Sequence, residues 1–306
     1  MSVPAPMDGN RFDVALAALA AVSRNKARRL IESERAGRFS GANEIPARPN
    51  ARVNEGETLW FRREVVAPVR PLRMALDVRY EDPHLAVVSK PSGMVVHPGP
   101  GNHDGTLVSA LLYRWPEVEG VGEYPRWGIV HRLDKDTSGA MVVARRSVAY
   151  RGLTDALASR NVHRTYLALV HGRFEVTTGT IDAPIDRRRA RRFVGPGGKP
   201  AVTHYRREAS WSRPPISLLQ VTLETGRTHQ VRVHMESIRR HLVGDPVYGR
   251  RARAGVDPGR VWLHAQRLRF THPVTNATVD ITAPLPSDLR SSLSNLGAPS
   301  LGTLPP

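Results

Sequence analysis

Apolar residues near the start of this 306-residue chain recur at helical spacing. In residues 11–34, Phe12, Leu16 and Leu19 lie three or four positions apart, and the pattern breaks near Val22 and Ser23. The spacing predicts two short helices. Ser23 is suited to begin the second one, because a serine hydroxyl can accept a backbone N–H of the first helical turn. Residues 48–61 predict a turn followed by a short strand.

Further along, the pattern changes to short apolar runs that predict buried strands. These runs are LAVVSK (85–90), AMVVAR (140–145), TYLALV (165–170), SLLQVTL (217–223) and VWLHAQRLRF (261–270). Helical patterns cover 147–160 and 228–240, so strands outnumber helices and do not alternate with them regularly. This order favours an α+β fold built on a mixed sheet over a doubly wound one.

Two segments lack any periodicity and predict the domain organisation. Residues 62–75 are rich in Pro and Arg, which is typical of a linker, and residues 286–306 have the Ser, Pro and Gly content of a flexible tail. We therefore expect a small N-terminal domain over 11–61 and a large domain over 76–285. Because the N-terminus has no secretory signal and no apolar run reaches about 18 residues, a cytoplasmic protein with no membrane contact is expected.

The excess of basic residues indicates which kinds of molecule this chain binds. Lys and Arg number 45 against 28 Asp and Glu, a formal net charge of +17, and nearly all the basic residues are arginines. The planar guanidinium suits phosphate groups and stacks on bases, so the excess points to nucleic acid, although a coding preference for arginine would also spread it along the chain. The absence of cysteine excludes disulfides, thiolate metal sites and cysteine nucleophiles.

One short stretch, GIVHRLDKDTSGAMVVAR (128–145), places Asp134 and Asp136 among basic residues. DKDTSG resembles the start of a calcium loop, but the glutamate required at its twelfth position is Arg145. HExxH, GxxxxGK[ST], GxSxG and a strand-GxGxxG-helix unit are all absent, so neither a metal nor a nucleotide cofactor is predicted. A carboxylate kept ionised by neighbouring cations suits nucleophilic or base chemistry, yet Asp134 could equally form a turn or a structural ion pair.

A resemblance to a known family decides between these alternatives. The chain resembles bacterial large-subunit pseudouridine synthases of the RluA/RluD type, and its N-terminal segment is similar to an S4 RNA-binding domain. The motifs follow the order found in that family: VSKPSGMVVHPGPGNHDGTLVSALL (88–112), GIVHRLDKDTSGAMVVA, RTYLALVHG (164–172), GKPAVTHYR (198–206), LETGRTHQVRVHM (223–235) and LVGDPVYG (242–249). Residues 35–44 depart from the family's usual strand and turn, so this S4-like domain could be degenerate.

The resemblance implies a site and a fold. It makes Asp134 the catalytic aspartate, Tyr166 the residue that packs on the target base and helps the proton leave C5, and Arg227 the basic partner of the aspartate. Arg132 would enter the RNA stack where the target base has left. The family's fold is a mixed, largely antiparallel sheet with flanking helices, and its reaction needs no cofactor.

The remaining residues expected to contact RNA lie in the basic helix and the motif loops: Arg24, Lys26, Arg28, His131, Lys199, His204 and His229. The preferred substrate is the 23S rRNA hairpin that meets the decoding region, with other 23S rRNA sites or tRNA as alternatives. A non-catalytic RNA-binding or ribosome-assembly protein is the rival function, and a monomer is the default oligomeric state.

Overall fold

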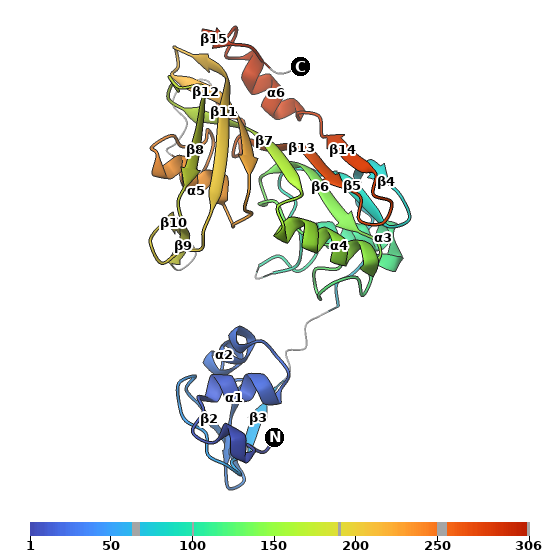
Figure 1. Ribbon diagram of the computed structural model, residues 1–306, viewed down its shortest axis with the longest axis vertical. Helices are drawn as coiled ribbons and strands as arrows, with labels where there is room; N and C mark the ends of the chain where they lie inside the picture. The colour runs from blue at the N-terminus through green and yellow to red at the C-terminus, as the bar shows by residue number, and fades with distance from the viewer. Residues whose placement is uncertain (63–67, 100, 189–190, 250–255, 305–306) are drawn as a thin grey trace. The chain divides into compact units, whose positions relative to one another are not determined.

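The chain forms two compact units, Met1–Pro68 and Val69–Pro306 (Figure 1). The computed structural model describes residues 1–62, 68–99, 101–188, 191–249 and 256–304. Residues 63–67 of the predicted linker therefore lie outside the described residues. The last part of that segment belongs to the second unit, because Val69 is buried and the Leu72 N–H donates to the Ser109 carbonyl at 3.0 Å.

The N-terminal unit packs helices on a small antiparallel sheet. Its elements are η1 (Ala5–Met7), α1 (Phe12–Leu19), α2 (Arg24–Glu32), β1 (Ala36–Ser40), β2 (Asn43–Pro46) and β3 (Leu59–Phe61), with strand order β2-β1-β3. The two predicted helices are confirmed, and the Ser23 hydroxyl accepts the Lys26 N–H at 3.3 Å as the cap of α2. Phe12 and Leu16 are fully buried, so α1 supplies the centre of this unit's core.

The second unit is built on a ten-stranded sheet. Eight strands follow the order β15-β11-β12-β7-β13-β6-β5-β4, while β14 pairs with β13 and β8 with β11. These strands are β4 (Asp77–Glu81), β5 (Leu85–Lys90), β6 (Ser138–Ala144), β7 (His163–His171), β8 (Thr178–Asp182), β11 (Val202–Trp211), β12 (Ile216–Leu223), β13 (Leu263–Thr271), β14 (Thr278–Thr282) and β15 (Leu301–Gly302). The described pairings of this sheet are antiparallel except for β13 with β6, so the expected mixed, largely antiparallel α+β fold is confirmed.

Helices and one separate hairpin complete the second unit. They are α3 (Leu107–Arg114), η2 (Pro116–Val118), α4 (Ser147–Ala158), α5 (Gln230–Ser237), α6 (Ser287–Ser294), and the hairpin of β9 (Ile185–Arg188) with β10 (Arg191–Val194). Alternate residues of β6 enter two different cores: Met141 packs with α3, whereas Val142 packs with α4. Because side chains alternate across a strand, α3 and α4 cover opposite faces of the sheet.

The predicted flexible tail over 286–306 is corrected by the structure. Residues Ser287–Ser294 form α6, which buries Leu289 and Leu293 against the core that contains Trp262. The Trp262 indole N–H also donates to the Ser292 hydroxyl at 2.7 Å, and β15 pairs with β11. Two leucines four residues apart form one apolar helical stripe, and the Ser and Gly content of the surrounding sequence obscured it.

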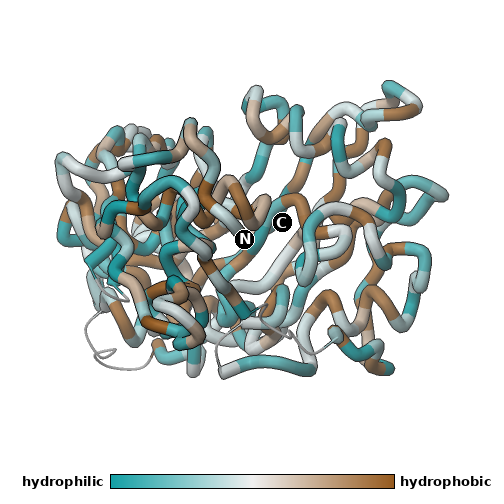
Figure 2. The backbone as a smooth tube through the Cα atoms, turned by 90° about the horizontal axis from the view of Figure 1, so that it is seen from below, coloured by the Kyte–Doolittle hydropathy of each residue, from teal (hydrophilic) through white to brown (hydrophobic). Residues whose placement is uncertain are grey.

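Hydrophobic and hydrophilic residues alternate in short runs along the chain (Figure 2). None of the helices in the described residues combines the length and apolar character required to cross a bilayer.

Candidate active site

A pocket of about 550 Å³ lies in the second unit and brings together the motifs found in the sequence. Its wall is formed by the loop that leads into β6, by strand β7, and by the segment between β12 and α5. The first of these segments carries Asp134, the second Tyr166 and the third Arg227. Gly139 allows this arrangement, because a Cβ at that position would lie 2.2 Å from the Ala265 carbonyl oxygen of the parallel strand β13.

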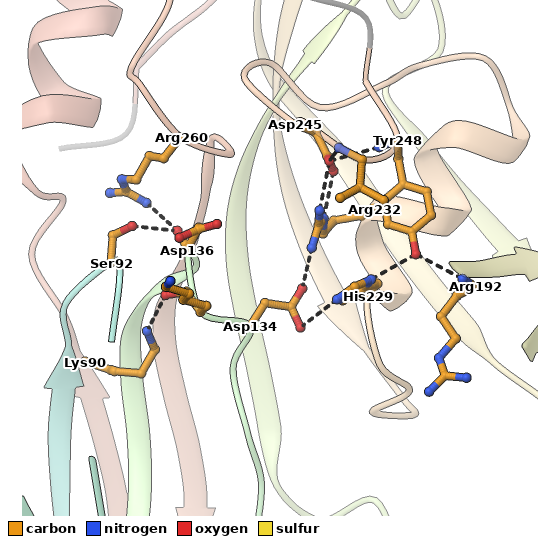
Figure 3. Close-up of polar contacts among 12 residues, drawn as sticks. Lys90, Ser92, Asp134, Asp136, Arg192, His229, Arg232, Asp245, Tyr248 and Arg260 are labelled. Carbon is orange, nitrogen blue, oxygen red and sulfur yellow. Dashed lines mark hydrogen bonds and ion pairs between the residues drawn. The ribbon is translucent and has the colours of Figure 1, made fainter. Parts of the chain in front are cut away.

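Asp134 is held by an arginine of helix α5. Nη1 of Arg232 lies 3.2 Å from Oδ2 of Asp134, and the same guanidinium donates to both oxygens of Asp245 at 2.7 and 2.8 Å (Figure 3). The Arg232 side chain is 8% exposed and that of Asp245 is fully buried. Burial would lower the pKa of Arg232, but the hydrogen bonds and charges of Asp245 and Asp134 raise it above its ordinary value. Arg232 is therefore a fixed cation shared by two carboxylates.

His229 approaches the other oxygen of Asp134. Its Nε2 lies 3.9 Å from Oδ1, and its Nδ1 is 2.9 Å from the Tyr248 hydroxyl, whose oxygen accepts the Arg192 N–H at 3.2 Å (Figure 3). Burial lowers the pKa of His229, so the neutral ring is favoured. When Tyr248 donates to Nδ1, the ring proton resides on Nε2 and faces Asp134. His229 also adopts φ 59°, a left-handed conformation that is uncommon for residues other than glycine.

The loop that carries Asp134 is held in place by hydrogen bonds from the side chains of other strands and loops. The Lys90 ammonium donates to the carbonyls of Pro91, Met94 and Lys135 at 2.7, 2.9 and 3.0 Å. Ser92 donates to the Asp136 carbonyl at 3.0 Å, and Arg260 donates to the same oxygen at 3.1 Å (Figure 3). The Asp136 backbone carbonyl thus helps to fix the turn, whereas the Asp134 side chain lines the pocket.

Three further predicted residues lie in the same pocket. Tyr166 is 6% exposed, and burial raises the pKa of its phenol, which keeps the group protonated. Arg132 is exposed at the rim. His131 differs, because its Nε2 accepts the Val142 N–H at 3.1 Å and burial lowers its pKa to about 3. A neutral His131 supplies no positive charge, so its role is to fix the loop against β6.

The structure corrects the assignment of Arg227 as the partner of Asp134. Arg227 lines the pocket and is exposed, but its Nε donates to the Pro200 carbonyl at 3.1 Å and its backbone N–H to Oε1 of Gln230. The ion pair belongs to Arg232, because the first turns of α5 direct that side chain toward Asp134 while Arg227 precedes the helix.

The other residues predicted to contact RNA lie outside this pocket. Lys199 is exposed before β11, and His204 is held between the Thr180 hydroxyl and Glu224 at 2.8 and 2.7 Å. Arg24, Lys26 and Arg28 project from α2 of the N-terminal unit, where Arg24 pairs with Asp13 and Arg28 with Glu32. Within the described residues, no cluster of three His, Asp or Glu side chains is arranged to hold a metal ion.

Sequence reasoning missed Arg232, Asp245 and Tyr248 as parts of the site. All three lie in motifs that it singled out, QVRVHM and LVGDPVYG, and this placement was the available signal. The ion-pair partner of Asp134 is determined by how α5 packs against the segment that follows it. The spacing of residues along the chain does not determine that packing.

Comparison with known proteins agrees with this geometry. Residues 84–237 match the family described as RNA pseudouridylate synthase. The ribosomal large subunit pseudouridine synthase D of Xanthomonas campestris is 43% identical, with 96% of this chain and 91% of the relative covered. The protein of the same name from Escherichia coli is 42% identical, with 79% and 77% covered.

A solved structure shows the same fold. Human RNA pseudouridylate synthase domain containing 1 superposes with a TM-score of 0.57 at 28% identity, with 71% of this chain and 87% of that chain covered. The family match spans the strands and loops that carry Asp134, Tyr166 and Arg232. This chain therefore belongs to the RNA pseudouridylate synthase family and is an isomerase.

Proposed function

We propose that the protein converts uridines of 23S rRNA to pseudouridine, with the hairpin that meets the decoding region as its target. The relatives named for the large ribosomal subunit support the substrate class. The observation that carries the proposal is the carboxylate of Asp134, held by Arg232 in a pocket whose rim presents Arg126, Arg132, Arg160 and Arg227. A site that only bound RNA would gain nothing from a carboxylate that repels phosphate.

The reaction divides between the ribose and the base. The bond between N1 and C1′ breaks, the uracil turns, and a new bond forms between C5 and C1′, so no group is added and no electron is transferred overall. Asp134 acts beside the ribose, either by attack on C1′ or by removal of the C2′ proton. Arg232 balances its charge in both routes and thereby keeps a negative carboxylate in a partly enclosed site.

Tyr166 serves the base in this proposal. A stacked uridine is inaccessible, so the nucleotide must leave the stack, which costs a few kcal/mol and requires a new surface for the base to pack on. The buried ring of Tyr166 on the pocket wall provides that surface. Because its phenol is protonated, Tyr166 accepts the C5 proton only after losing its own.

The arginines of the rim and of the N-terminal unit contact the RNA backbone. Arg132, exposed next to the catalytic loop, is proposed to occupy the gap left by the flipped nucleotide. The S4-like unit adds the exposed basic face of α2, with Arg24, Lys26 and Arg28. Contacts of this kind bind phosphates without reading bases, so they increase affinity and leave selection to the pocket.

The experiment that tests this function maps pseudouridines in rRNA and tRNA from cells that lack the protein. Wild type or Asp134→Asn is then restored. We expect loss at the 23S hairpin, recovery with wild type and none with Asp134→Asn, although the variant still binds RNA. Loss at other positions would identify a different substrate, and an unchanged map would contradict the enzymatic assignment to cellular RNA.

A further inference from the structure

Arg164 differs from the other buried arginine of the pocket. It lies on β7 and is 8% exposed, and among the described residues no carboxylate lies within ion-pair distance of it and no hydrogen bond to its side chain is found. Its Nε is buried without a partner. Arg232 lines the same pocket and is also buried, but it contacts two carboxylates. Of the two buried guanidiniums of the pocket, Arg232 therefore has carboxylate partners and Arg164 has none among the described residues.

A largely buried charge without an ion-pair partner is costly, because the guanidinium loses part of its hydration, at Nε above all, and gains no carboxylate in return. Arginine cannot relieve this cost by releasing its proton at any ordinary pH. The side chain does not escape into solvent either, because it lies under Gly226, where a Cβ would come within 2.7 Å of Nη1. The fold thus holds a cation at the pocket surface without a carboxylate partner among the described residues.

The position of Arg164 relates it to the target nucleotide. Arg164 and Tyr166 are two residues apart on β7 and therefore project from the same face of the strand, about 7 Å apart along it. The positive charge of Arg164 opposes the rise that burial causes in the pKa of Tyr166, as expected for neighbours. A nucleotide whose base packs on Tyr166 carries its own phosphate close to this spot.

We propose that Arg164 binds the phosphodiester of the flipped nucleotide. This inference rests on the proposed function and adds to it an anion subsite inside the pocket, separate from the arginines of the rim. The flat guanidinium can donate two parallel hydrogen bonds to a phosphate, and the bound anion supplies the counter-ion that the free protein lacks. Substrate entry then compensates a charge that was buried at a cost during folding.

The test compares Arg164→Met with Arg160→Met in the full chain. Arg160 is a matched control, because it lines the same pocket but is exposed and already paired with Glu224 at 2.5 Å. Binding of a synthetic 23S hairpin is measured in an Asp134→Asn background over a range of salt concentrations. Arg164→Met should weaken binding about tenfold to hundredfold and reduce the salt slope by about 0.7–0.9, whereas Arg160→Met should cost at most about fivefold.

A second arm locates the phosphate. A hairpin with one neutral methylphosphonate at the target nucleotide should bind the parent protein more weakly, and it should bind Arg164→Met no more weakly than the unmodified hairpin does. Arg164→Lys keeps the charge but not the paired donors of the guanidinium, so its affinity for the hairpin should lie between those of wild type and Arg164→Met. Additive losses from the methylphosphonate and from Arg164→Met would overturn the assignment, since independent contacts add.

A third arm needs no RNA and separates this inference from the proposed function. Arg164→Met should raise the Tm of the free protein, because it removes an unpaired charge, whereas loss of a merely structural arginine would lower it. Inorganic phosphate should raise the Tm of wild type more than that of Arg164→Met. Equal phosphate shifts, or a destabilised Arg164→Met, would refute the anion subsite. Failure of wild type to modify the hairpin would instead contradict the proposed target.

Discussion

The ion pair between Arg232 and Asp134 supports a prediction that separates stability from catalysis. Methionine at position 232 keeps a similar length but removes the charge. Asp245, whose side chain is fully buried, would then lose the cation that holds both of its oxygens. Truncating one partner of a buried pair costs about 3–5 kcal/mol. In a unit of this size each kcal/mol of lost unfolding free energy lowers the Tm by roughly 2–4 °C. The Tm of Arg232→Met should therefore be about 6–20 °C below that of wild type.

Activity should fall for a different reason. Arg232→Met also removes the contact at 3.2 Å to Asp134, and a hydrogen bond between charged groups contributes about 1.5–3 kcal/mol. If that contact strengthens in the transition state, kcat should fall about 10-fold to 150-fold when measured well below the Tm. Release of tritium from RNA labelled at C5 of its uridines, measured over multiple turnovers at saturating RNA, provides the assay.

The double variant Arg232→Met/Asp245→Asn is the decisive control. It removes the buried charge that Arg232→Met leaves unpaired at Asp245, so part of the lost Tm should return. Asp134 still lacks its cation, so kcat should stay low. Recovery of kcat in parallel with the Tm would refute the reasoning, because it would show that Arg232 affects catalysis only through folding.

Three further predictions concern other polar contacts of the second unit. Tyr248→Phe removes the hydroxyl that orients His229, so kcat should fall several-fold with RNA affinity unchanged, and adding His229→Ala should cause little further loss; additive losses would separate the two residues. Lys90→Met leaves the carbonyls of Pro91 and Met94 without a donor, and it leaves the Lys135 carbonyl with the Gly93 N–H alone, so both Tm and kcat should fall. An unchanged kcat would show that the loop carrying Asp134 holds its shape without the lysine. Asp82 accepts hydrogen bonds from the Tyr80 hydroxyl and from the backbone N–H groups of His84 and Leu85. Burial raises the pKa of Asp82 and of Asp245, but their hydrogen bonds and cationic neighbours bring both pKa values below the ordinary 3.8. The stability that these groups contribute is present above pH 3.8 and is lost as the pH falls through their folded-state pKa values, so the Tm should drop steeply in acid and less steeply in Asp82→Asn.

Much of the fold could be predicted from local patterns. The apolar runs 85–90, 140–145, 165–170, 217–223 and 261–270 fall within or overlap strands β5, β6, β7, β12 and β13. Strands buried on both faces give such continuous runs, so they are visible without any knowledge of their neighbours. Strand β11 was missed as an element because Val202–Trp211 mixes arginines with apolar residues, and part of it was noted only as a motif. Helix α6 was missed because two leucines carry its entire apolar face.

The sequence motifs predicted which segments form the site, but they did not predict which side chains pair within it. Asp134 and Tyr166 belong to motifs that occur in a specific order, and both line the pocket. The partner of the aspartate could not be identified in this way, because in a chain of net charge +17 an arginine is close in sequence to almost any position.

What distinguishes the arginines of the pocket is burial and pairing, and both are set by tertiary structure. Exposed arginines such as Arg132 and Arg227 remain hydrated, so we expect each to add only modest, salt-dependent affinity for RNA. Arg232 is buried with two carboxylates and therefore belongs to the protein's own charge balance. Arg164 is buried without such a partner among the described residues, which makes it the arginine whose charge is left for the substrate. We therefore propose three functions for one residue type in one pocket, and the packing around each guanidinium determines which one it has.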